Sequence, residues 1–317
     1  MKSRRRLNIV ERRMLRILWS WVVHLANLPH EMQFQRVAPI IKFILYRVLL
    51  YRVGTVRRNL RRSFPEKSRA ERRRIRDDYY TYLSETIIST IALARKSSYN
   101  TIFDDEHHAP HNREAAELCE RIEDRSWIAL TAHFGLWEYL LYWSQFSNQK
   151  LLGVYHPLSN RLFDTLFKLL RRKQNVLAIP THNVGRFIMT HGHRHKGESY
   201  TLGLIADQNP PPMRNYNWYE FLNQPTVFFE GGEKFAMKFG LPIYFIYQRR
   251  IAAGRYQFCA TALWDGTEQV TPTQITARYV RMLEDLIRQD PSIWLWSHRR
   301  WKYRRTEGNS INVDLIR

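Results

Sequence analysis

Cysteine is scarce in this sequence, which has only two among 317 residues, Cys119 and Cys259. Their separation matches neither a metal-binding motif nor a redox motif. We therefore do not expect a disulfide framework, as is usual for a protein of a reducing compartment. The simplest interpretation is that both cysteines are small apolar residues of the interior.

The N-terminal region lacks an apolar run of the length that normally spans a bilayer, roughly twenty residues. Its first apolar stretch, residues 14–28, is interrupted by an arginine and a histidine, and no signal-peptide cleavage site follows it. Tilt or bilayer thinning would let this stretch span, so spanning and surface attachment both remain open. In a second stretch, residues 37–51, the long stems of Lys42 and Arg47 suit a helix lying at the level of the lipid headgroups.

Acidic residues are also few, because 29 Asp and Glu stand against 50 Lys and Arg, a formal net charge of +21. Residues 1–76 hold 21 basic and 4 acidic residues, whereas the rest of the chain is nearly balanced, with 29 and 25. Such a surface attracts nucleic acid, anionic membranes or acidic proteins. No helix-turn-helix, zinc-finger or aromatic-sheet motif accompanies the charge, so we do not expect nucleic acid as a partner. Arginines that flank aromatic-rich apolar helices favour the surface of an anionic, cytoplasmic leaflet.

The chain shows no internal repeat and no low-complexity linker in its body. We divide it into a basic, aromatic membrane-contact segment of helices, residues 1–60, and an α/β domain, residues 61–317. A capping box of Ser68 and Glu71 predicts the start of a helix over residues 69–96. Residues 101–113 are predicted to form a loop.

After this loop, short apolar runs alternate with amphipathic segments. This alternation predicts an α/β fold with a mixed, mostly parallel sheet covered by helices on both faces. Ligands of such sheets bind outside the carboxyl ends of the strands. The predicted strands are residues 127–132, 151–155, 176–179, 200–206, 242–247 and 256–263, and the predicted helices are residues 136–147, 160–172, 233–239 and 273–289.

A histidine and a glutamate five residues apart follow the first of these strands. His133 stands at the strand's end, Gly135 permits a tight turn, and Glu138 opens the next helix. At such a corner the carboxylate can fold back onto the imidazole, fix its tautomer and leave the other ring nitrogen free to accept a proton. N–H groups beside Gly135 are candidates to stabilise an oxyanion. This spacing also arises often by chance, so by itself it does not establish catalysis.

Six sequence blocks, taken together and in order, resemble the late acyltransferases of lipid A biosynthesis, the lauroyl and myristoyl transferases. The resemblance covers roughly residues 14–305 and extends to lysophospholipid-type acyltransferases with the same His-x-x-x-x-Asp/Glu motif. It implies a glycerol-phosphate-acyltransferase-like fold. The blocks are YRVGTVRRNLRRSFPEKS (51–68), AHFGLWE (132–138), VYHPLSN (154–160), ADQNP (206–210), FFEGG (228–232) and WLWSHRRWKYR (294–304).

The resemblance implies an O-acyltransferase with His133 as general base and Glu138 as its partner. The acyl donor would be a thioester of an acyl carrier protein or acyl-CoA, with no cofactor, no metal and no covalent acyl-enzyme. The acceptor would be a hydroxyl of an anionic lipid, most simply a lipid A precursor, at the cytoplasmic face of a bacterial inner membrane. The alternatives are another acceptor (an aminolipid, a glycolipid or a pigment) or a non-catalytic lipid-binding protein of the same fold.

The resemblance also suggests substrate-binding residues. Many family members have an arginine where this chain has His156, so either His156 takes a weaker version of that role or Arg161 covers it. Asp207 and Gln208 follow a predicted strand and are expected to shape the site or bind the acceptor. Arg299 and Arg300 are expected to contact an anionic acceptor or form the wall of the site, and the FFEGG block is a weaker candidate for a phosphate site.

Overall fold

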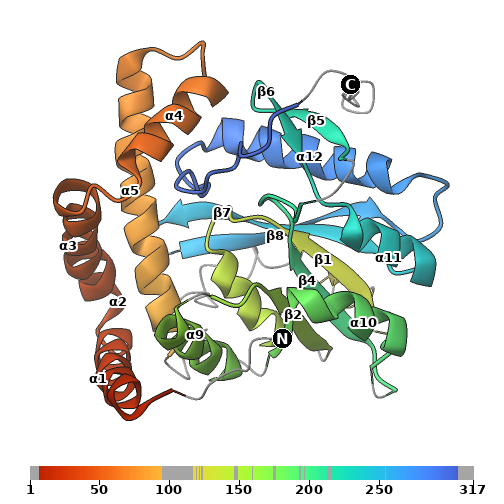
Figure 1. Ribbon diagram of the computed structural model, residues 1–317, viewed down its shortest axis with the longest axis horizontal. Coiled ribbons are helices and arrows are strands. Elements are labelled where there is room, and N and C mark those ends of the chain that lie inside the picture. The colour runs from red at the N-terminus through yellow and green to blue at the C-terminus, as the bar shows by residue number, and fades with distance from the viewer. Residues whose placement is uncertain are drawn as a thin grey trace.

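A six-stranded sheet forms the centre of the computed structural model (Figure 1). The strand order is β3-β2-β4-β1-β7-β8, with β8 antiparallel to β7 and the other neighbouring pairs parallel. The structure describes residues 7–94, 117, 118, 120, 122, 124–145, 149–158, 160–173, 176–192, 194, 195, 197–212, 216–253 and 255–305. The strands are β1 (Trp127–Thr131), β2 (Lys150–Tyr155), β3 (Leu177–Pro180), β4 (Tyr200–Ile205), β7 (Ile243–Ala252) and β8 (Arg255–Trp264), and β5 (Trp218–Phe221) with β6 (Gln224–Val227) forms a separate antiparallel hairpin.

Helices follow most strands and precede the sheet. They are α1 (Ile9–Ala26), α2 (His30–Met32), α3 (Ala38–Phe43), α4 (Val53–Ser63), α5 (Arg69–Ala92), α9 (Arg161–Lys173), α10 (Thr181–His191), α11 (Gly231–Phe239) and α12 (Pro272–Gln289), with π-helical segments at Gln33–Val37 and Ile44–Val48 and a 3₁₀ helix, η3, at Trp137–Gln145. Figure 1 shows α1, α2 and α3 along the outer side of α5, away from the sheet, and α1 and α3 both contact α5.

The sheet is buried on both faces, as its apolar strands predict. Successive side chains of β1 point to opposite faces. Ile128 and Leu130 join a cluster with buried residues of α10, α11 and α12. Trp127 and Ala129 join a second cluster with buried residues of α1 and α9. The predicted α/β fold, with a mostly parallel sheet covered by helices on both faces, is confirmed.

The N-terminal helices expose an unusual amount of apolar surface. On α1, Ile17 and Trp21 are 60% and 63% exposed, and Leu49 and Leu50 are similarly exposed at the tip that precedes α4. Among the described residues, no helix is both long enough and apolar enough to cross a bilayer.

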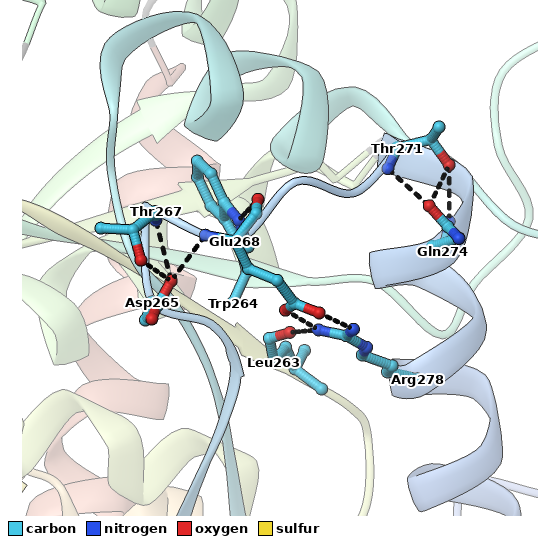
Figure 2. Close-up of polar contacts among 8 residues, drawn as sticks. All are labelled: Leu263, Trp264, Asp265, Thr267, Glu268, Thr271, Gln274 and Arg278. Carbon is cyan, nitrogen blue, oxygen red and sulfur yellow. Dashed lines mark hydrogen bonds and ion pairs between the residues drawn. The ribbon is translucent and has the colours of Figure 1, made fainter.

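The connection from β8 to α12 is held by polar contacts that the sequence specifies locally (Figure 2). Asp265 accepts a hydrogen bond from the N–H of Glu268 at 3.1 Å, and the carboxylate of Glu268 pairs with both terminal nitrogens of Arg278 at 2.6 Å. Thr271 and Gln274 form a capping box at the start of α12. These contacts fix where α12 begins, and α12 then covers one face of the sheet.

Most predicted elements lie where they were expected, and α5 begins at the predicted capping box. The structure adds two elements that the sequence did not indicate, α10 and the β5–β6 hairpin. The end of the predicted helix at residue 96, the predicted loop at residues 101–113 and Cys119 lie outside the described residues, and Cys259 is buried. The proposed domain boundary at residue 60 falls within α4 and remains a prediction.

Candidate active site

The backbone after β1 forms a turn that is fixed from three directions. Gly135 has φ +65°, and a Cβ at this position would lie 2.9 Å from the Cβ of Gln248, so the turn requires glycine. The N–H of Gly135 donates to the carbonyl of Ile293 at 3.0 Å, and its carbonyl accepts from the hydroxyl of Tyr82 at 2.8 Å. The N–H of Leu295 donates to the carbonyl of His133 at 3.1 Å. Because the N–H of Gly135 has this partner, it is not available to stabilise an oxyanion.

This turn presents the imidazole of His133 to a buried aspartate. Nδ1 of His133 lies 2.7 Å from Oδ1 of Asp207, and Oδ2 of Asp207 accepts from the indole N–H of Trp294 at 2.8 Å. The parallel register of β1 and β4 pairs Thr131 with Ile205, and each site residue stands two positions beyond its strand. The contact therefore results from adjacent parallel strands ending at the same level.

The surroundings of Asp207 favour its ionised form. Burial alone would raise the pKa of Asp207, but the charge and hydrogen bonding of His133 and the hydrogen bond from Trp294 hold that pKa below its usual value. A carboxylate at Nδ1 keeps a proton on that nitrogen and leaves the lone pair at Nε2. Since the His133 side chain remains 15% exposed, Nε2 is the candidate base.

The amide of Gln208 covers the imidazole in this arrangement. Its Nε2 lies 3.1 Å from Nε2 and 3.3 Å from Nδ1 of His133. One donor cannot lie along both ring N directions at once, so the amide lies beside the ring rather than in line with either nitrogen. The ring of Trp137 meets the imidazole edge-on at a centroid distance of 5.0 Å. Gln208 therefore borders the position that an acceptor hydroxyl would occupy.

Glu138 lies half-buried in the first turn of η3. The acid that contacts Nδ1 of His133 at 2.7 Å is Asp207. The pairing of His133 with Glu138 remains a prediction. Sequence analysis named Asp207 but missed its contact with His133, although both follow strands by two residues, which is the signal that would have revealed it.

The C-terminal block forms the wall behind Asp207. Arg300 is fully buried, donates to the carbonyl of Val227 at 2.6 Å and stacks over Phe228 at 4.4 Å from the ring centroid. Burial lowers the pKa of Arg300 to about 10, against the opposing effect of Asp207, so the guanidinium remains charged at neutral pH. Arg299 is exposed, and its carbonyl accepts from Asn209 at 2.9 Å. The structure therefore favours a wall role for Arg300 and leaves Arg299 accessible.

Two predicted binding residues lie beyond this centre. His156 follows β2, is exposed, and its Nδ1 lies 3.5 Å from the hydroxyl of Thr181. Arg161 opens α9 and lies 3.8 Å from a carboxylate oxygen of Glu11 on α1. Arg161 thus links α9 to the N-terminal segment.

The FFEGG block does not offer a simple phosphate site. Glu230 and Glu233 are both buried at the start of α11. Glu230 accepts a hydrogen bond from Asn217 at 2.7 Å, and Glu233 accepts one from Thr276 at 2.9 Å. Burial raises the pKa of Glu233 to about 7. Carboxyl groups at this helix start disfavour a bound anion.

Comparison with known proteins identifies one protein family that matches most of the chain. Residues 7–303 match the family described as bacterial lipid A biosynthesis acyltransferase. No curated protein matches the sequence.

Proposed function

Because the chain belongs to the bacterial lipid A biosynthesis acyltransferase family, we propose that it transfers a fatty acyl chain to a hydroxyl of a lipid A precursor. The acyl donor is the thioester of an acyl carrier protein or of coenzyme A. The observation that carries the proposal is the 2.7 Å contact of Asp207 with Nδ1 of His133, which leaves Nε2 as the base.

The proposed reaction is direct transfer with general base catalysis. Nε2 of His133 takes the proton of the acceptor hydroxyl as its oxygen attacks the thioester carbonyl carbon. The tetrahedral oxyanion is stabilised by backbone N–H groups after Gly135. When this intermediate collapses, the C–S bond breaks, the thiolate leaves with the proton from the imidazolium, and an ester remains. A thioester is already activated, so no acyl-enzyme is needed.

Two acidic residues are proposed to assist His133 as the base. Asp207 holds the tautomer of His133 through Nδ1, in the way the acid of a catalytic triad does. Glu138 is proposed as a second acid that supports the imidazolium during proton transfer.

We further propose that the protein acts at the cytoplasmic face of the bacterial inner membrane. The exposed apolar side chains of α1 and the excess of basic residues within residues 1–76 support attachment to an anionic surface. The same positive field would attract an acidic acyl carrier protein, in an encounter that weakens with salt.

The decisive experiment is lipid mass spectrometry after incubation with acyl carrier protein thioesters or acyl-CoA and lipid A precursors. The wild-type protein should add one acyl mass to the precursor, and His133→Ala should reduce the rate by about 10²–10⁴-fold. Circular dichroism and vesicle binding of the variant should match the wild type. Wild-type turnover in His133→Ala would refute the mechanism.

A further inference from the structure

The turn that joins Leu49 to α4 has a strained backbone. Leu50 and Arg52 have φ +47° and +55°, in the left-handed region that residues other than glycine rarely adopt. Such a conformation persists only where the surrounding structure imposes it.

Two hydrogen bonds and a pair of stacked aromatic rings hold the turn in this conformation. The N–H of Tyr51 donates to the carbonyl of Leu45 at 2.8 Å, and the carbonyl of Tyr51 accepts from the hydroxyl of Tyr80 at 2.5 Å. The Tyr80 ring stacks on that of Tyr46, with centroids 4.4 Å apart and planes within 6°. The turn is thus fixed to α5.

Helices α4 and α5 connect the turn to residues 297–298, which belong to the C-terminal block behind Asp207. Tyr79, whose ring meets that of Tyr80 at 5.2 Å, accepts a hydrogen bond from the N–H of Ser297 at 3.1 Å. On α4, Asn59 donates to the carbonyl of His298 at 3.0 Å. The turn and residues 297–298 are therefore held in a fixed relation.

The pKa of His298 agrees with a position of Arg52 near residues 297–298. Burial and the positive charges of Arg300, His133 and Arg52 lower the pKa of His298 to about 4, against the opposing effect of Asp207. His298 therefore lies within electrostatic reach of both the catalytic histidine and Arg52.

Arg52 differs from Arg300 and Arg161, two of the arginines that sequence analysis selected. Its side chain is exposed, and it makes no ion pair with any residue in the part of the chain that the structure describes. Arg300 is buried and bonded to a carbonyl, and Arg161 lies beside Glu11. Next to Arg52, Leu49 and Leu50 are 63% and 62% exposed, which suits contact with acyl chains.

We propose that Arg52 binds a phosphate group of the lipid acceptor beside residues 297–298 of the site wall, while Leu49 and Leu50 contact the lipid chains next to it. This inference rests on the proposed function and adds a headgroup-binding residue to it. A guanidinium can form paired, charge-assisted hydrogen bonds with phosphate. The strained turn is held in a fixed relation to residues 297–298 while the Arg52 side chain stays exposed.

The main test is Arg52→Gly, which removes the cation but suits the backbone because glycine adopts positive φ without strain. Arg52→Lys keeps the charge and loses the paired geometry. The control is Arg61→Ala on α4, the helix that follows the turn, an equal change of charge at an exposed position. Each variant is assayed with a phosphorylated lipid A precursor and with its enzymatically dephosphorylated form.

With the phosphorylated acceptor, Arg52→Gly should raise the acceptor KM by about tenfold or more, with kcat nearly unchanged. Arg52→Lys should lie between it and the wild type, and Arg61→Ala should match the wild type. With the dephosphorylated acceptor, Arg52→Gly and the wild type should have equal KM values. Inorganic phosphate should inhibit the wild type weakly by competing with the acceptor, and it should inhibit Arg52→Gly less. Weak inhibition indicates that binding also needs the lipid, whereas strong inhibition indicates a general anion site.

Three outcomes would overturn the inference: an unchanged acceptor KM in Arg52→Gly, an equal loss with both acceptors, or a rise confined to the acyl donor's KM. In each case the wild type still transfers acyl groups. Failure of the proposed function would instead appear as no transfer by the wild type to either acceptor.

Discussion

His133, the proposed base, is oriented by an acid that is distant in sequence. Nδ1 of His133 contacts Asp207 at 2.7 Å, and Trp294 holds the other oxygen of that carboxylate. The hydrogen bond fixes which ring nitrogen carries the proton, and this choice is what makes Nε2 basic toward a substrate. Glu138, closer in sequence, is the acid that the motif predicts.

Two variants discriminate between these acids. Asp207→Asn should lower kcat by about two to four orders of magnitude, because an amide can donate to Nδ1 and stabilise the wrong tautomer. Glu138→Gln is also predicted to lower kcat, and steady-state kinetics of both variants gives the comparison. If Asp207→Asn kept wild-type kcat while Glu138→Gln lost it, Glu138 would be the partner in the reacting state.

Glu233 should make the stability of the protein depend on pH. Burial raises its pKa from the ordinary 4.5 to about 7. Between these values the folded protein keeps the proton while the unfolded chain releases it, so the free energy of unfolding falls as pH rises, by up to about 1.4 kcal/mol per pH unit. This stabilisation is fully present below pH 4.5 and is lost by pH 7.

Glu233→Gln keeps an oxygen for Thr276 and cannot ionise. Urea unfolding at pH 5 and pH 8 should therefore show a smaller loss of stability in this variant than in the wild type. Identical pH slopes for the two proteins would contradict the shifted pKa.

At the scale of elements, strands that begin with a buried apolar run were the most predictable. The runs that became β1 and β4 are short and apolar because helices cover both faces. Helix α10 was missed because only Ile188 of its eleven residues is fully buried, so it carries little apolar periodicity. The β5–β6 hairpin was missed because Pro225 lies inside one strand and its burial depends on α12, which contacts β5.

The start of α12 should respond to loss of its cap. The hydroxyl oxygen of Thr271 accepts from the N–H of Gln274 at 3.2 Å, and the side-chain oxygen of Gln274 accepts from the N–H of Thr271 at 2.8 Å (Figure 2). Thr271→Ala should lower the free energy of unfolding by about 1 kcal/mol, measured by urea denaturation. Thr271→Ser, which keeps the hydroxyl, serves as the control and should retain most of that stability. An unchanged midpoint in Thr271→Ala would show that the contacts of Asp265 and Glu268 suffice.

At the scale of the whole molecule, positive charge and exposed apolar groups occur in the same N-terminal part of the chain, residues 9–76. Binding to anionic vesicles should therefore be strong and should weaken as salt rises, because screening reduces the electrostatic part alone. Zwitterionic vesicles should bind less.

Substitution of the exposed residues Ile17 and Trp21 by aspartate should lower vesicle binding at every salt concentration, as measured by co-sedimentation. The fold should persist, since both side chains already face solvent. Vesicle binding equal to that of the wild type would place the attachment surface elsewhere.

The composition of the site was largely predictable, whereas its assembly was not. His133, Asp207 and Arg300 were all named from the sequence. Their contacts depend on which strands are neighbours and on their register, and separate apolar runs contain no information on either. The burial of Arg300 was also not predictable, because a sequence does not distinguish an exposed arginine from one that lies over Phe228.

The pairing of Phe134 with Trp294 has a consequence for biosynthesis. During translation, the segment with His133 leaves the ribosome long before the segment that supports it. A nascent chain that ends before Ile293 already contains the base and both acids, but it lacks the indole and the backbone partners that hold them. We therefore expect partially synthesised chains to attach to the membrane through their early helices while remaining inactive, so that acyl transfer begins only after the tryptophan-rich block has docked.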